Sequence, residues 1–176
     1  SFRREDISDL VRQSMFLQEV GHPGIGYRFH AEPGDTGIDC DRHQVGQAMT
    51  NVLKNAAEAI EARKLAEGES YRGHIEVALQ PDRDGVTITV TDNGSGLPQQ
   101  GERIVEPYMT TREKGTGLGL AIVQKILGEH GGHIGFDPAP DGGTTVRMRF
   151  ARDPLAEEAG ARSVDAAEDK GQQAAE

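Results

Sequence analysis

The stretch TREKGTGLGLAI, residues 111–122, holds three glycines at every second position. Gly115, Gly117 and Gly119 come directly before an apolar run, so we expect them at the beginning of a buried helix. The first N–H groups of a helix have no partners within it, and the helix dipole favours anions there. Glycines leave those amides exposed, and the pattern therefore predicts a backbone cradle for phosphate groups.

The glycine run differs from two common phosphate-binding signatures. The dinucleotide pattern G-x-G-x-x-G fails because Leu120 occupies the place of its third glycine, and no strand is expected before it. No G-x-x-x-x-G-K-[ST] sequence occurs in the chain. Which phosphate-bearing ligand this glycine run would bind therefore depends on the polar groups that lie beside it.

A row of polar side chains lies on one face of an expected helix, Asp41–Ala62, opposite its apolar stripe, and Asp41 is the expected N-cap of this helix. Gln47, Asn51, Asn55 and Glu58 fall within an arc of roughly 80° at 3.6 residues per turn. Mg²⁺ prefers oxygen ligands and shares its shell with waters and substrate phosphates. The row is a candidate for such an ion. An ordinary solvated helix face is the alternative, which two mid-helix asparagines weaken.

The stretch TVTDNGSGLP places Asp92 at the end of an expected strand. Asn93-Gly94 is a common hairpin turn, which is the alternative interpretation, but no strand follows it. Instead the polar segment 93–116 contains no expected element, and so long a loop in a compact domain is usually functional. In the functional interpretation Asp92 accepts a hydrogen bond from an exocyclic amine, while the glycines let a flat base lie against the backbone.

These stretches must be positioned by elements that the periodicity of apolar residues predicts. Helices are expected at Asp6–Leu17, Asp41–Ala62 and Leu118–His130, and strands at Tyr27–Ala31, Gly37–Cys40, 74–80, 86–92, 133–137 and 144–150. Strand pairs joined by turns favour a mixed or mainly antiparallel sheet with helices packed on one face. We therefore expect a two-layer α/β sandwich and not a doubly wound fold.

The composition limits the classes of protein. A formal net charge of −10 argues against nucleic acid as a partner, because phosphates require a basic face. The single cysteine excludes a disulfide framework and favours a reducing compartment, and no apolar run is long enough to span a membrane. Residues 151–176 are rich in Ala and Glu, and we expect a disordered acidic tail there, with a short Ala-rich helix as the alternative.

In their order along the chain, the polar helix row, the Asp92 stretch and the glycine run resemble the catalytic ATP-binding domain of sensor histidine kinases, a class shared with Hsp90, MutL and type II topoisomerase ATPases. NVLKNAAEAI resembles the N box, DNGSGL the G1 box, and EPYMTTREKGTGLGLAI the lid with its G2 box. The longer stretch EPYMTTREKGTGLGLAIVQKILGEHGG is especially similar to nitrogen-regulation sensor kinases of the NtrY/NtrB type. The resemblance covers residues 6–150 and implies the Bergerat fold, a mixed, mostly antiparallel five-stranded sheet with three helices on one face.

The resemblance implies a role for each matching residue. Asn55 is expected to coordinate Mg²⁺, Asp92 to bind the adenine amine, and Thr144 to lie near the adenine. Residues 93–116 are expected to form the ATP lid. The remaining candidate ATP-binding residues are Asn51, Lys54, Glu58, Gly94, Gly96, Leu97, Arg112, Lys114, Gly115, Thr116, Gly117, Leu118, Gly119 and Leu120.

The sequence departs from the family pattern at two places. Val105 and Tyr108 occupy positions that are usually phenylalanine on either side of a proline. The family pattern therefore does not predict how the lid docks in this chain. Glu58 occupies a position that is basic in many relatives, which weakens the case for a phosphate contact there.

The resemblance also implies what the chain cannot do alone. Hydrolytic relatives place a glutamate four residues before the metal-binding asparagine, where this chain has Asn51, so a water-activating base is not expected. Sensor kinases phosphorylate a histidine in a stretch like H-E-x-x-[NP] on a helical dimerisation domain. The six histidines here lack that context and are expected at the surface or at helix ends: His22, His30, His43, His74, His130 and His133.

We therefore expect a kinase domain that binds Mg-ATP and presents the γ-phosphate to a histidine elsewhere, without phosphorylating itself. Residues 1–20 would follow an upstream dimerisation domain and pack on the ATP-binding domain, 21–150. The implied partners are that upstream domain and a response regulator of the nitrogen-regulation type, in a homodimeric parent of which this fragment alone is a monomer. A cytoplasmic location fits, with the parent anchored in the inner membrane. A hydrolytic ATPase and a catalytically silent nucleotide-binding module are the alternatives.

Overall fold

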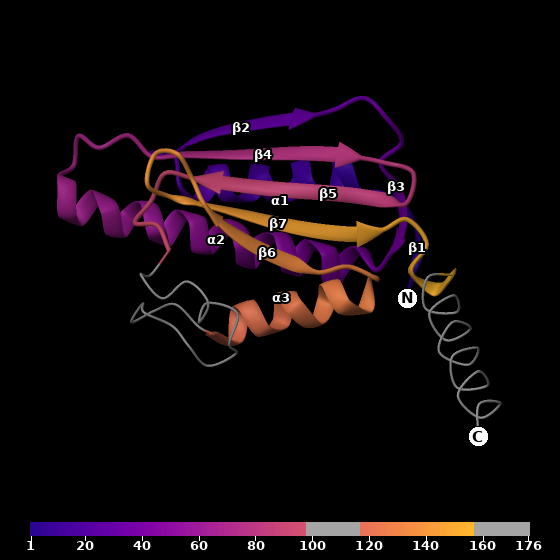
Figure 1. The fold of residues 1–176 in the computed structure, drawn as a ribbon. Helices are drawn as coiled ribbons and strands as arrows, with labels where there is room; N and C mark the ends of the chain where they lie inside the picture. Colours follow the sequence, from indigo (N-terminus) through magenta and orange to yellow (C-terminus); the bar gives the residue numbers. More distant parts are fainter. Residues whose placement is uncertain (98–116, 157–176) are drawn as a thin grey trace, which may run out of the picture.

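In this computed structural model, the described residues, 1–97 and 117–156, form three helices and seven strands (Figure 1). In chain order they are β1 (Arg3–Asp6), α1 (Ile7–Gly21), β2 (Gly26–Ala31), β3 (Gly37–Cys40), α2 (Arg42–Glu67), β4 (His74–Pro81), β5 (Gly85–Asp92), α3 (Gly117–Glu129), β6 (Ile134–Pro138) and β7 (Thr144–Ala151). Most of the expected lid and of the expected tail lies outside these residues.

Five strands form one mixed sheet in the order β2-β4-β5-β7-β6. The β2–β4 pair is parallel, and the three other pairs are antiparallel. The three helices lie on one side of this sheet, with α2 between α1 and α3 (Figure 1). The prediction of a two-layer α/β sandwich with a mostly antiparallel five-stranded sheet is therefore confirmed.

Period-two alternation in the strands places one apolar face against the helices. In β5, Val86, Ile88 and Val90 are fully buried, while the intervening threonines are partly exposed on the helix-free face. Cys40 also lies in the core, and burial raises the pKa of its thiol to about 12. It is therefore not a thiolate nucleophile at neutral pH. No helix among the described residues is long and apolar enough to cross a membrane.

The start of α2 follows the predicted capping, but α1 and α2 are both longer than predicted. The carboxylate of Asp41 accepts hydrogen bonds from His43 N at 2.9 Å and Gln44 N at 3.2 Å, which makes it the N-cap of α2. This helix ends at Glu67 and not at Ala62, because residues 63–67 are good helix formers and the first breaker is Gly68, with φ +110°. Helix α1 likewise continues past Leu17 to Gly21, because residues 18–20 contain no breaker and the first ones are Gly21 and Pro23.

Strand β1 was not predicted from the sequence. Its four residues, RRED, contain no apolar side chain and therefore no alternation. They form a strand because they pair antiparallel with β3 in a separate two-stranded sheet. Arg4 adds an ion pair to Asp39 across this pair at 3.2 Å. The pairing is long-range, so only the tertiary structure reveals it.

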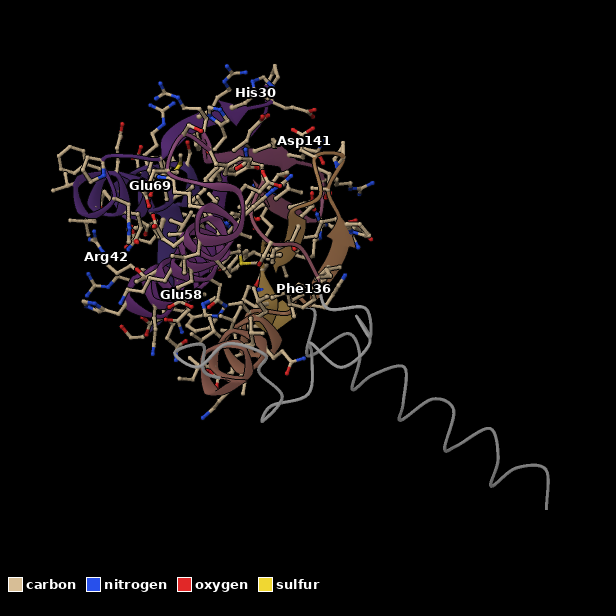
Figure 2. The ribbon with its side chains drawn as sticks, turned by 90° about the vertical axis from the view of Figure 1, so that its left-hand side faces the viewer. His30, Arg42, Glu58, Glu69, Phe136 and Asp141 are labelled. Carbon is tan, nitrogen blue, oxygen red and sulfur yellow. The ribbon has the colours of Figure 1, made fainter. Side chains whose placement is uncertain are left out.

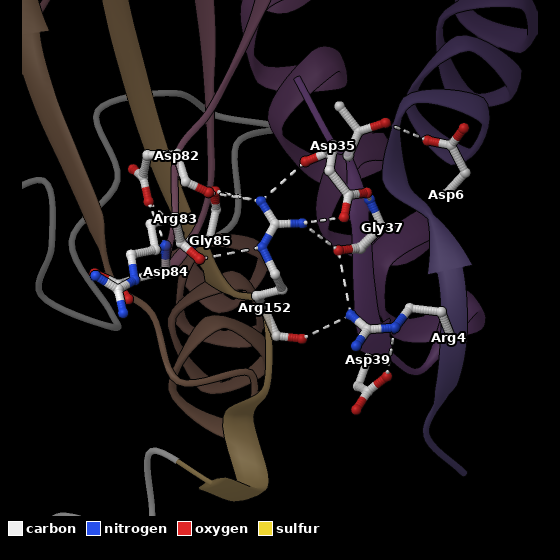
Figure 3. A network of polar contacts seen from close by, with 11 residues as sticks. Arg4, Asp6, Asp35, Gly37, Asp39, Asp82, Arg83, Asp84, Gly85 and Arg152 are labelled. Carbon is white, nitrogen blue, oxygen red and sulfur yellow. Dashed lines mark hydrogen bonds and ion pairs between the residues drawn. The ribbon is translucent and has the colours of Figure 1, made fainter. Parts of the chain in front are cut away.

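Ordered structure continues past residue 150, into the segment expected to be a tail. Strand β7 extends to Ala151, and the guanidinium of Arg152 donates to the carbonyls of Gly37 at 2.7 Å and Asp82 at 2.6 Å. A further hydrogen bond reaches the Asp35 carbonyl at 2.9 Å (Figure 3). Arg152 thus ties the β2–β3 and β4–β5 connections to the end of β7. The expected tail boundary at 151 is too early, and residues 157–176 lie outside the described part.

His130 directly follows the last residue of α3, at a helix end as expected, but it is fully buried and does not lie at the surface. Its Nδ1 lies 2.7 Å from the Ile126 carbonyl, and its Nε2 accepts a hydrogen bond from Asp41 N at 3.1 Å. A carbonyl only accepts, so Nδ1 carries the proton and the ring is neutral. The ring stacks on Phe2 and meets Phe150 edge-on.

Acidification below about pH 6.5, the ordinary pKa of histidine, is expected to destabilise the folded chain through His130. Burial lowers the pKa of this imidazole, against the raising effect of its hydrogen bond to the Ile126 carbonyl. In the window below the ordinary pKa, the unfolded chain therefore binds a proton that the folded chain does not. The stabilisation is fully present above the window and decreases as the pH falls through it. Urea unfolding across this range measures the effect.

The variant His130→Phe isolates this contribution. It is expected to lose about 1–3 kcal/mol of stability near neutral pH, because Asp41 N loses its acceptor. Below the histidine pKa its free energy of unfolding should depend less on pH than that of the unmodified chain. His133→Phe, at an exposed position, is the control and should keep the original slope. Equal slopes for His130→Phe and the unmodified chain would contradict the assignment.

Candidate functional site

The acidic group at the centre of the candidate site is Asp92, the last residue of β5. It continues the helix-facing series Ile88 and Val90, and it is only 5% exposed. Its Oδ1 accepts a hydrogen bond from Gly94 N at 2.8 Å. A buried carboxylate therefore has a fixed orientation at the end of a rigid strand.

The loop that follows β5 lies directly on α2. A Cβ atom at Gly94 would overlap the backbone of Ala59, and Ser95 N donates a hydrogen bond to the Ala59 carbonyl at 2.9 Å. Gly94 is therefore required for a close backbone approach, a reason that holds whether or not a base lies beside it. Gly96 has φ +81°, where other residues are strained, and a Cβ there would meet the Gly142 carbonyl.

Thr144, the first residue of β7, lies one residue beyond the last pair of the β5–β7 ladder, as Asp92 does on β5. Thr91 pairs with Thr145 across β5 and β7, and their hydroxyl oxygens are 3.0 Å apart on the helix-free face. Asp92 and Thr144 are the next residues along each strand, so the alternation places both on the helix-covered face. The resemblance places both residues near the adenine, and that role stays a prediction.

The polar row of α2 lies beside the first turn of α3. Asn51, Asn55 and Glu58 are partly exposed, and Lys54 is exposed. Asn51 Nδ2 donates a long hydrogen bond of 3.4 Å to the carbonyl of Gly119. The row therefore lies next to the helix start that the glycine pattern predicts as a phosphate cradle.

The predicted residues form two groups near the end of the molecule where β5 ends and α3 begins (Figure 1), which is the end that faces the viewer in Figure 2. One group surrounds the end of β5: Asp92, Gly94, Gly96, Leu97 and Thr144. The other lies on α2 and the start of α3: Asn51, Lys54, Asn55, Glu58, Gly117, Leu118, Gly119 and Leu120. The candidates Arg112, Lys114, Gly115 and Thr116, and the departures Val105 and Tyr108, lie outside the described residues.

Sequence reasoning missed Arg63, which contacts the loop after β5 from α2. Its Nη1 donates to the carbonyls of Asn93 at 3.1 Å and Asp141 at 2.5 Å. The only sequence signal is its spacing, four residues after Ala59 and therefore on the same helix face. That signal was lost because the helix was predicted to end at Ala62.

Residues 40–154 match the family described as "Histidine kinase-, DNA gyrase B-, and HSP90-like ATPase". This match covers more than half of the chain, and the chain therefore belongs to that family. The family fits the geometry above, in which an acidic strand end faces an amide-bearing helix and a glycine-rich helix start.

Individual proteins that are similar to the chain include histidine kinases. The chain is 47% identical over 156 residues to "Nitrogen regulation protein NtrY" of Azorhizobium caulinodans, covering 87% of this chain and 20% of that protein. The catalytic domain of histidine kinase ThkA has a TM-score of 0.74 at 29% identity, covering 88% of this chain and 98% of the other. A structure of ThkA in complex with response regulator protein TrrA has a TM-score of 0.70 at 26% identity, covering 88% and 42%. The chain spans about a fifth of the length of its NtrY relative.

Proposed function

We propose that this chain is the catalytic ATP-binding domain of a two-component sensor histidine kinase of the nitrogen-regulation type. It binds Mg-ATP and presents the γ-phosphate to a histidine on a separate dimerisation domain. The observation that carries the proposal is the convergence of Asp92, the polar row of α2 and the first turn of α3 at one end of the sheet. The 47% identity to NtrY supports the same function.

Each part of the site has a chemical task in this proposal. Asp92 is an acceptor of fixed orientation, suited to the exocyclic amine of adenine, and Thr144 begins the neighbouring strand β7. The first amides of α3 suit the phosphates, because that end of the helix dipole attracts anions. The lid candidates Arg112 and Lys114 and the exposed Lys54 would add positive charge.

The side chains on α2 fit a magnesium ion that shares its shell with nucleotide. Asn55 offers an amide oxygen on the partly exposed face of the helix, and Asn51 lies one turn before it. Among residues 1–97 and 117–156, no group of three or more His, Cys, Asp and Glu forms a metal cage. One protein oxygen completed by waters and phosphates is the usual coordination of Mg²⁺ in such sites. The ion, when bound, would neutralise charge on the transferred phosphoryl group.

A kinase is favoured over a hydrolytic ATPase by the residue at position 51. An amide cannot accept a proton from water as a general base, and Asn51 is moreover engaged with Gly119. The protein contribution to phosphoryl transfer is then positioning and charge neutralisation, with the nucleophile supplied by another domain.

The finer assignments follow from the same proposal. The partners are the parent's own dimerisation domain and a response regulator of the nitrogen-regulation type, as the complex of ThkA with TrrA suggests by analogy. The parent is a homodimer with this domain in the cytoplasm and an anchor in the inner membrane. Nucleic acid is not a partner, given the net charge of −10.

The proposal predicts that the isolated chain binds Mg-ATP but does not label itself. Incubation with γ-labelled ATP should leave it unlabelled, because no histidine with an acceptor context is present. Adding a separately produced dimerisation domain of an NtrY-type kinase should transfer label to that domain. Phosphate release into solution should stay at background.

Three experimental results would contradict the proposed kinase function or favour one of its alternatives. Strong self-labelling would contradict the absence of an acceptor, and steady phosphate release would favour the hydrolytic ATPase. Binding without any transfer to a cognate acceptor domain would favour the silent nucleotide-binding module.

A further inference from the structure

The peptide group between Asn93 and Gly94 connects two sets of contacts. Its N–H, on Gly94, donates to Asp92 Oδ1 at 2.8 Å. Its carbonyl, on Asn93, accepts from Tyr71 OH at 2.5 Å and from Arg63 Nη1 at 3.1 Å. Because a peptide group is planar, a force that fixes the carbonyl direction also fixes the direction of the N–H. The orientation of the Asp92 carboxylate therefore depends on two side chains that do not touch it.

Arg63 is held in place from several sides. Its guanidinium lies over the Tyr71 ring at 4.7 Å, and its Nε pairs with Glu67 at 3.3 Å on the same helix. Its side chain is 24% exposed, so these contacts are partly shielded from water. Burial raises the pKa of Tyr71, which keeps its hydroxyl protonated as a donor. Arg63 and Tyr71 together, called the pair below, thus present fixed donors to the Asn93 carbonyl.

The same guanidinium donates hydrogen bonds to carbonyl groups from two parts of the chain. Arg63 Nη1 also donates to the carbonyls of Gly94 at 3.4 Å and of Asp141 at 2.5 Å, in the β6–β7 turn. Converging carbonyl oxygens repel one another unless a cation lies between them. A guanidinium has five donors and no acceptor, and it fits this place where a neutral side chain does not. Arg63 therefore clamps the loop after β5 between α2 and the β6–β7 turn.

The Asn93 side chain holds the other side of the loop. Its Oδ1 accepts from His74 N at 2.7 Å, and its Nδ2 donates to the Arg72 carbonyl at 2.9 Å. These contacts fix Asn93 to the beginning of β4. The Asn-Gly pair is thus not a hairpin turn: the Asn93 side chain anchors the loop to β4, while Arg63 and Tyr71 orient the carbonyl of its peptide.

We propose that Arg63 and Tyr71 are positioning residues that set the base specificity of this domain, by orienting the Asp92 carboxylate through the Asn93–Gly94 peptide. This inference rests on the proposed function, in which Asp92 binds the adenine amine. Donors on the carbonyl polarise the peptide and strengthen its N–H as a donor to Asp92. Loss of the pair should let the peptide rotate and should weaken discrimination between bases with and without an exocyclic amine.

The test compares ATP with inosine triphosphate, which lacks that amine, by calorimetry on the full 176-residue chain. Arg63→Ala should lower ATP affinity by at least about tenfold, as expected for a lost charged hydrogen bond, with a much smaller effect on inosine triphosphate. Tyr71→Phe keeps the ring beneath the guanidinium but removes one donor, and should show a smaller change in the same direction. Arg63→Lys keeps one charged donor and should restore part of the preference for ATP.

A second readout needs no nucleotide. The Gly94 amide resonance reports its hydrogen bond to Asp92, and it should shift in both Arg63→Ala and Tyr71→Phe. Arg72→Ala is the matched control, because it removes a nearby exposed positive charge while keeping the carbonyl that Asn93 uses. That control should leave both the Gly94 resonance and the ratio of the two affinities unchanged.

The outcomes separate this inference from the proposed function. An unmodified chain that binds neither nucleotide, or both equally, would overturn the assignment of Asp92 and with it the role of the pair. A chain that prefers ATP, with the same preference in Arg63→Ala and Tyr71→Phe, would overturn the positioning role alone. If Arg63→Ala does not fold, Tyr71→Phe decides by the same two readouts.

Discussion

Replacing Asp92 with asparagine is expected to lower ATP affinity by about 30- to 100-fold, or about 2–3 kcal/mol, while the fold persists. The residue is the only buried carboxylate among the described residues, and it ends a strand whose other inward side chains form the core. The substitution keeps the volume and removes the charge. The change in affinity therefore reports the chemistry of one group.

The physical reason is the hydrogen bond from Gly94 N, which fixes one oxygen of the carboxylate. In the Asp92→Asn variant, the Gly94 N–H would donate to the amide oxygen of the new side chain, because an N–H can donate only to an acceptor. The amide NH₂ must then take the place of the other carboxylate oxygen. A donor would face the donor amine of adenine, so the variant loses an attraction and gains a repulsion.

Calorimetric titration of Mg-ATP into both chains, with thermal unfolding as a check of the fold, measures this effect. Asp84→Asn is the matched control, because Asp84 is exposed in the β4–β5 turn at the other end of the sheet. It should bind as the unmodified chain does. An Asp92→Asn chain that is folded and keeps its affinity would rule out Asp92 as the adenine acceptor.

Replacing Asn55 with alanine is expected to abolish the contribution of Mg²⁺ to nucleotide binding. In the unmodified chain the ion should raise ATP affinity, because it links the triphosphate to a side-chain oxygen of α2. Without that oxygen, affinities measured with Mg²⁺ and with a chelator should become nearly equal. Transfer to a separate acceptor domain should fall by at least about 100-fold, since charge neutralisation at the phosphates is lost.

The control for Asn55→Ala is Gln13→Ala, which removes an exposed helical amide on α1, away from the candidate site. It should retain the full dependence on Mg²⁺. Binding that still responds to Mg²⁺ in Asn55→Ala would move the metal ligand to another residue. Asn55→Asp adds a useful comparison, because it keeps an oxygen in place but adds a negative charge beside the phosphates, and it should weaken metal-nucleotide binding.

The sequence by itself determined most of the elements and the candidates for the site. Apolar periodicity located all three helices and six of the seven strands of the described chain, and Asp41 was identified as an N-cap. Such signals are local, since alternation and capping act between residues a few positions apart. Asp92, the polar row of α2 and the glycine-rich start of α3 became candidates through short local motifs, and the family resemblance suggested their roles.

The tertiary structure alone decided the contacts between distant segments. Strand β1 forms only because β3 lies beside it, and His130 is buried only because the start of α2 and the end of α3 meet there. Arg63 gains its role from carbonyls that lie 30 and 78 residues away along the chain. No local pattern encodes which backbone oxygens will converge on a side chain, because that depends on how the loops pack after the sheet and helices have assembled.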